Sequence, residues 1–73
     1  MARVVALGEP VAVAGFGLAG AVVVPAADDA SVRAAWDGLD DDVAVVILTP
    51  MAARALGPML GSALHPLTVV LPR

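Results

Sequence analysis

The stretch GEPVAVAGFGLAG, residues 8–20, decides how this chain folds. Residues 15–20 spell G-x-G-x-x-G, a pattern that binds the pyrophosphate of a dinucleotide when it directly follows a strand and opens a helix. Here the apolar run Val4–Leu7 comes earlier, Pro10 intervenes, and the glycines follow later. The position of the glycines relative to the strand therefore separates a nucleotide site from a helix that ends in glycine.

The nucleotide interpretation requires a helix that starts near Gly17 and continues through Val22-Val23-Val24-Pro25. Three β-branched residues and a proline are unfavourable in a helix interior. The fingerprint also needs an acidic residue about 20 residues further on, at a strand end. The next strand-like run ends in Thr49-Pro50 instead. The sequence therefore disfavours a nucleotide site, and no cofactor is predicted.

The other interpretation is locally consistent. Val4–Leu7 form a buried strand, and Pro10 occupies the first helical position, where its missing N–H costs nothing. A short helix over Val11–Leu18 ends near Gly20, which is suited to a helix C-cap. Ala21–Val24 then form a second strand that ends at Pro25.

The rest of the chain continues the alternation of strand and helix. Asp28 or Asp29 caps a helix whose inward stripe has apolar spacing, namely Val32, Ala35, Trp36 and Leu39. Val43–Leu48 is a continuous apolar run, which is typical of a strand covered on both faces. Thr49-Pro50 begins a third helix, with a short further turn at Met59, Leu60 and Leu64. Leu67–Leu71 form the last strand.

This order predicts a single domain over residues 1–73 of the α/β class. We expect a small Rossmann-like or flavodoxin-like fold of three layers, with a four-stranded parallel sheet in the order 2-1-3-4. The residues that follow the strands, namely Glu9, Pro25, Thr49 and Pro72, should then lie at one edge of the sheet.

Composition limits the function. Seven acidic residues and four arginines give a net charge of −3, with no cysteine and one histidine. Nucleic acid requires a clustered positive face, so it is not an expected partner. The only histidine, His65, has no recognisable nucleophile or base beside it, and no catalytic or metal residue is predicted. Asp40-Asp41-Asp42 is interpreted as a solvated turn because it precedes a strand, whereas metal and phosphate ligands belong at carboxyl ends.

The uncharged run over residues 10–27 raises the question of a membrane segment. It contains two prolines and three glycines, and its hydrophobicity comes mostly from alanine and valine. A secretory signal would carry Glu9 inside its apolar part. No direct membrane insertion is expected.

The chain resembles the F subunit of the central stalk of the vacuolar/archaeal-type (V/A-type) rotary ATPases. That family opens with a strand ending in Gly-Asp and a helix closing in Gly-Phe-x-Leu-Ala-Gly, which are similar here to Gly8-Glu9 and residues 15–20. The strand that ends in Thr49 and the closing residues 66–73 also resemble the family's later strands. The chain departs from the family at Gly17, where Arg is usual, and at Pro50, where an acidic residue is common. It stops at Arg73, before the family's C-terminal helix.

The resemblance implies a non-catalytic rotor component of the central stalk, not an enzyme in itself. Such a protein binds the coiled-coil rotor shaft and other ATPase subunits, and couples ATP turnover or synthesis to rotation and to proton or sodium transport. It would be cytoplasmic and peripheral to the membrane through the complex. Phe16, Met51 and Met59 are candidate residues for the partner interface.

Two alternatives stay open. The chain could be a receiver-like or small-ligand-binding α/β domain, whose ligand groups would lie at the carboxyl ends of the strands. It could also be a truncated or diverged product without a working complex.

Overall fold

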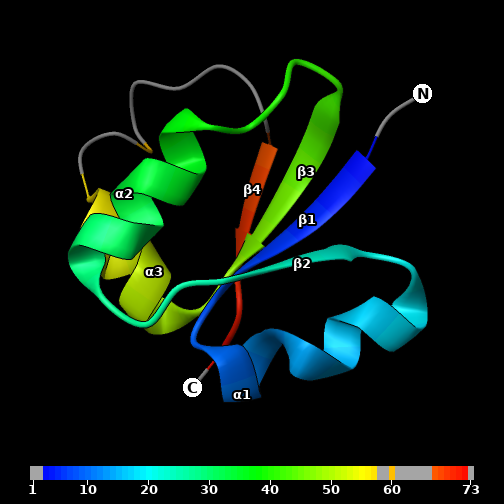
Figure 1. Cartoon of the computed structure of the whole chain (residues 1–73), viewed down its shortest axis with the longest axis horizontal. Coiled ribbons are helices and arrows are strands. Elements are labelled where there is room, and N and C mark those ends of the chain that lie inside the picture. Colours follow the sequence, from blue (N-terminus) through cyan, green and yellow to red (C-terminus); the bar gives the residue numbers. More distant parts are fainter. Residues whose placement is uncertain (1–2, 58–59, 61–66, 73) are drawn as a thin grey trace.

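The computed structural model describes residues 3–57, 60 and 67–72. They form a four-stranded sheet, all parallel, in the order β2-β1-β3-β4. The strands are β1 (Arg3–Gly8), β2 (Val22–Pro25), β3 (Val43–Leu48) and β4 (Leu67–Val70). The fold is a small Rossmann-like or flavodoxin-like α/β domain, so the predicted class and strand order are confirmed (Figure 1).

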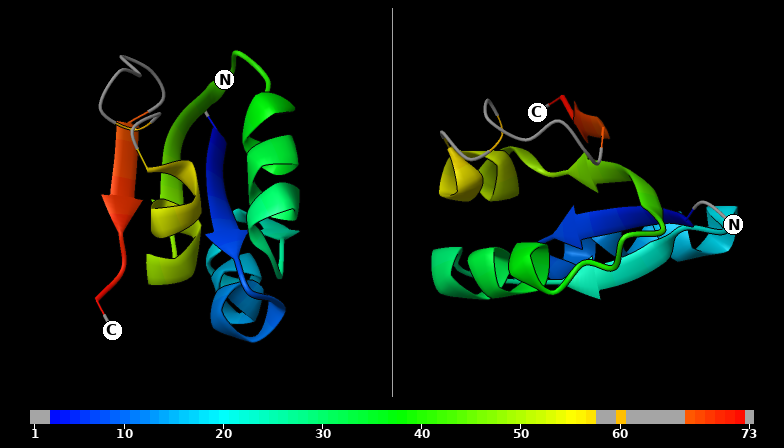
Figure 2. Two further views of the ribbon diagram at one scale, coloured as in Figure 1. Left: turned by 90° about the vertical axis from the view of Figure 1, so that its left-hand side faces the viewer. Right: turned by 90° about the horizontal axis from the view of Figure 1, so that it is seen from above.

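Helices lie on both sides of this sheet. α1 (Pro10–Val13) runs into the 3₁₀ helix η1 (Ala14–Ala19), and both contact β2. α2 (Asp29–Asp37) and α3 (Pro50–Leu56) pack side by side on the other face (Figure 2). The Arg33 side chain joins these two helices, because its Nε donates a hydrogen bond to the Ala55 carbonyl at 3.3 Å.

The first helix differs from the predicted one in its geometry. Pro10 begins it as expected, and Gly20 ends it with φ of 92°, the left-handed conformation that glycine adopts readily. Only its first turn is α-helical, and the rest is 3₁₀. Glycines at 15 and 17 weaken the α-helix, since each costs about 1 kcal/mol relative to alanine in a helix interior.

The main core lies between the sheet and the pair α2 and α3. Leu7, Val32, Leu48 and Leu56 are almost completely buried there. Trp36 lies on the predicted inward stripe but is only partly buried against this cluster. The large aromatic side chain therefore covers the core from its margin, and the aliphatic side chains fill the centre.

The predicted coverage of β3 on both faces is wrong for one face. Val46 and Leu48 are buried beneath α2 and α3, but Val45 and Ile47, which face the α1 side, are only half-buried. α1 and η1 contact β2, and α1 also contacts β1, so they cover only part of the sheet. The predicted further turn at Met59 and Leu64 lies outside the described residues.

Candidate functional site

The carboxyl ends of the strands meet at one edge, as the sequence predicts. Gly8 pairs with Pro25, and the Ala26 N–H donates to the Gly8 carbonyl at 2.7 Å. The Thr49 N–H donates to the Leu7 carbonyl at 3.2 Å, and the Leu71 N–H to the Leu48 carbonyl at 2.8 Å. Residues that follow all four strands are thereby held at this edge.

Glu9 and Thr49 form the polar centre of this edge. The Thr49 hydroxyl donates a hydrogen bond to the Glu9 carboxylate across the ends of β1 and β3. The same oxygen accepts from the Ala52 N–H at 3.2 Å and so caps α3. The hydrogen bond from Thr49 is the main reason that the pKa of Glu9 lies below its ordinary value.

Gly8 permits this contact because it brings the backbone against Thr49. A Cβ atom at position 8 would lie 2.3 Å from the Thr49 side chain, which is closer than real Cβ contacts. The sequence predicted both residues at one edge, but their direct packing depends on the register of β1 against β3.

In open α/β sheets, ligands bind outside the carboxyl ends where neighbouring strands have their helices on opposite faces. β1 and β3 form such a point here, since the helix after β1 and the helix after β3 lie on opposite faces (Figure 2). Glu9 and Thr49 therefore occupy the position at which this fold binds small molecules. The hydroxyl of Thr49 is already engaged with Glu9 and Ala52.

The glycines at 15, 17 and 20 lie elsewhere. They are part of η1 and its C-cap, which precede β2. A dinucleotide fingerprint instead joins a strand to a following helix.

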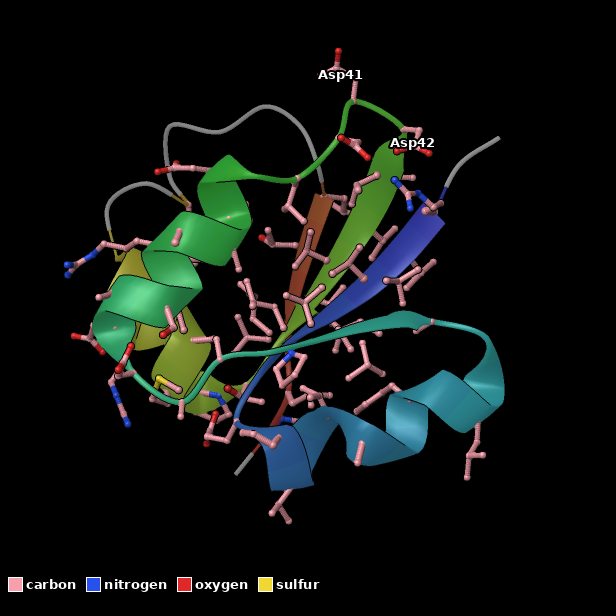
Figure 3. All side chains as sticks on the ribbon, viewed as in Figure 1. Asp41 and Asp42 are labelled. Carbon is pink, nitrogen blue, oxygen red and sulfur yellow. The ribbon has the colours of Figure 1, made fainter. Side chains whose placement is uncertain are left out.

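The acidic turn lies at the opposite, amino-terminal edge of the sheet. Arg3 Nη2 donates to the Asp40 carboxylate at 2.8 Å and to the Asp42 carboxylate at 2.9 Å. The hydrogen bond from Arg3 lowers the pKa of Asp42, and the pKa of Arg3 is raised in turn. Figure 3 shows Asp41 pointing away from the sheet. The turn therefore ties the starts of β1 and β3 together. Among the described residues, no three His, Asp or Glu side chains are placed to hold a metal ion.

The candidate interface residues are not equally accessible. Phe16 is half-buried on η1, and Met51 is half-buried on α3, where it packs against the main core. Met59 lies outside the described residues. Sequence reasoning missed Val11 and Leu18, whose surfaces are 92% and 96% exposed. The signal for them was the lack of charge in residues 10–27, which left the first helix without a polar face.

No protein-family model matches this chain, and no curated protein matches it. Within the part of the chain that the structure describes, no helix has both the length and the apolar character needed to cross a bilayer.

Proposed function

We propose that this domain is a non-catalytic central-stalk component of a vacuolar/archaeal-type rotary ATPase. It binds the coiled-coil rotor shaft and other ATPase subunits, and through these contacts couples ATP turnover to rotation and to proton or sodium transport. Its place is on the cytoplasmic side, peripheral to the membrane.

The observation that carries this proposal is the surface of the first helix. The motif residues 15–20 form η1 and its glycine cap, and this segment has no ionisable side chain. Val11 and Leu18 are almost completely exposed on α1 and η1. Interface centres are depleted of charge, and exposed apolar patches mark sites of interaction. The segment that carries the family resemblance is thus suited to contact a protein.

The test is co-purification from the native membrane fraction with the tagged protein as bait. The rotor shaft protein and other ATPase subunits should be recovered with the wild type. Leu18→Asp should lose them, because docking would bury a carboxylate in an apolar contact. Ala30→Asp is the matched control, because Ala30 is exposed on α2 and an acidic residue is favourable in the first turn of a helix. Absence of ATPase subunits from the wild-type eluate would overturn the proposal.

A second candidate function, a small-ligand or receiver-like domain, is favoured by the Glu9–Thr49 pair at the carboxyl edge. Such a domain should show a thermal-stability increase with Mg²⁺ or a phosphoryl donor such as acetyl phosphate. Glu9→Gln should abolish that increase while the co-purification stays unchanged.

A further inference from the structure

One face of the sheet has a strip of apolar side chains that α1 and η1 leave open. Side chains alternate along a strand, so the strand register places one set of residues on the α1 side. Ala6, in this set, is completely buried. The members beyond it are exposed or half-buried and form what we term the open strip: Val4, Val45, Ile47, Leu67 and Val69.

The open strip has the width of one helix. It lies mainly over β3 and β4, and two neighbouring strands span about 10 Å, close to the diameter of an α-helix with its side chains. α1 and η1 lie over the neighbouring strands β1 and β2 as a raised ridge (Figure 1). This side of the domain therefore has a ridge with an adjacent slot.

The ridge itself has an apolar outer side. Val11 and Leu18 are 92% and 96% exposed, so they point away from the sheet that the ridge covers. Ala14 and Gly15 lie between them in the chain and are also exposed, and a Cβ atom at Gly15 would meet nothing within 4 Å. Small residues permit close approach of another surface. The outer side of the ridge has the character of a helix face that packs on a sheet.

Neither surface has a charge. The ridge and the open strip have no ionisable residue, whereas the described charged residues lie on α2, on α3, at strand ends and in the acidic turn. This is the side on which two chains, each with a net charge of −3, meet without burying a carboxylate.

We infer that two copies of this chain associate through this side as a two-fold dimer. The ridge of each copy occupies the slot of the other, so that the two sheets enclose a central layer made of both ridges. One isologous contact thereby covers both exposed apolar surfaces. The inference does not depend on the ATPase proposal, since it concerns the protein alone.

The size of the surface sets the strength of the dimer. Val11, Leu18, Leu67, Val69 and Val4 are between 40% and 96% exposed. They provide on the order of 500 Å² of apolar surface per copy, below the roughly 800 Å² that each partner buries in a standard interface. Association should therefore be concentration-dependent in the micromolar to millimolar range.

Sedimentation equilibrium of the purified chain tests the inference. The wild type should change from monomer to dimer with concentration. Val69→Lys and Leu18→Lys should each raise the dimer Kd by about tenfold or more, because each would bury an ammonium group in an apolar contact. Val70→Lys is the matched control. Val70 is 49% exposed and Val69 47%, but Val70 pairs with Leu48 and faces the side of α2 and α3. Its Kd should stay within about twofold of the wild type.

Crosslinking decides the geometry even where a lysine variant fails to fold. The chain has no cysteine, so Leu18→Cys and Val69→Cys introduce unique thiols. A mixture of the two variants with a short bis-maleimide should yield the 18–69 product between copies. A monomer at all concentrations, an equal effect of Val70→Lys, or the absence of the 18–69 product would overturn the inference. Recovery of ATPase subunits in the co-purification is a separate result and alters none of these outcomes.

Discussion

At the scale of single residues, the contact between Gly8 and Thr49 is the tightest constraint at the carboxyl edge. A Cβ atom at position 8 would lie 2.3 Å from Thr49 side-chain atoms, while one at Gly15 would meet nothing. Gly8→Ala should therefore lower the free energy of unfolding by about 1–3 kcal/mol, the usual cost of overpacking. Gly15→Ala, the matched control, should be neutral or stabilising. Urea denaturation measures both, and equal midpoints would contradict the close approach.

Thr49 also combines two roles that one substitution removes together. Its oxygen caps α3 and its hydroxyl proton binds Glu9. Thr49→Val keeps the shape but loses both, and should cost about 1–3 kcal/mol of stability. Thr49→Ser retains the hydroxyl and should lose less. A valine variant as stable as the serine variant would show that the hydroxyl contributes nothing.

Three carboxylates make folding sensitive to acid. Hydrogen bonds from Thr49, from the Ser31 N–H and from Arg3 lower the pKa values of Glu9, Asp28 and Asp42 respectively. Their stabilising effect is complete above the ordinary pKa values near 4, and it is lost as the pH falls through the lowered folded values. Urea midpoints should therefore be steady at neutral pH and decline below about pH 4. Glu9→Gln should reduce that decline, and a constant wild-type midpoint down to about pH 3 would contradict these pKa shifts.

At the scale of elements, α2 depends on its first residue outside the helix. The Asp28 carboxylate accepts from the Ser31 N–H at 2.8 Å, whereas Asp29 is exposed within the first turn. Asp28→Ala should cost about 1 kcal/mol, and Asp28→Asn should restore most of it because asparagine is an equally good N-cap. Thermal unfolding measures these changes. Asp29→Ala should have the smaller effect, and a larger one would place the cap at residue 29.

The same scale corrects the expectation for Trp36. On the sequence alone, its place on the inward stripe suggests that truncation would cost as much as a full core cavity. Because Trp36 is only half-buried, Trp36→Ala should cost less than Leu56→Ala, which opens a cavity at a residue that is 1% exposed. A buried leucine truncation costs about 2–5 kcal/mol. Urea denaturation of both variants compares them, and a larger loss for Trp36 would contradict this burial pattern.

At the scale of the whole molecule, the position of the glycine-rich segment predicts how the protein responds to nucleotides. The segment is the end of a helix ahead of β2, so its backbone N–H groups are not arranged as a phosphate-binding loop. Calorimetry of the full chain with NAD and with ATP should detect no micromolar binding. Binding of either nucleotide that Gly15→Val abolishes would instead establish the dinucleotide fingerprint.

The sequence by itself determined the order of the elements and much of their chemistry. Pro10, Gly20, Asp28 and Thr49 act locally, through φ angles and caps within a few residues, so their roles are readable from short patterns. The parallel sheet and its order then follow from the alternation of strands and helices and from the right-handed crossover rule.

Only the tertiary structure decided which distant groups meet. Thr49 binds Glu9 across 40 residues, and Arg3 binds Asp40 and Asp42 across 37 and 39. These contacts depend on strand register, which local periodicity does not encode. The open strip is of the same kind. The apolar run Val43–Leu48 looks alike on both faces in the sequence, and its exposure on one face results from where α1 and η1 end over the sheet.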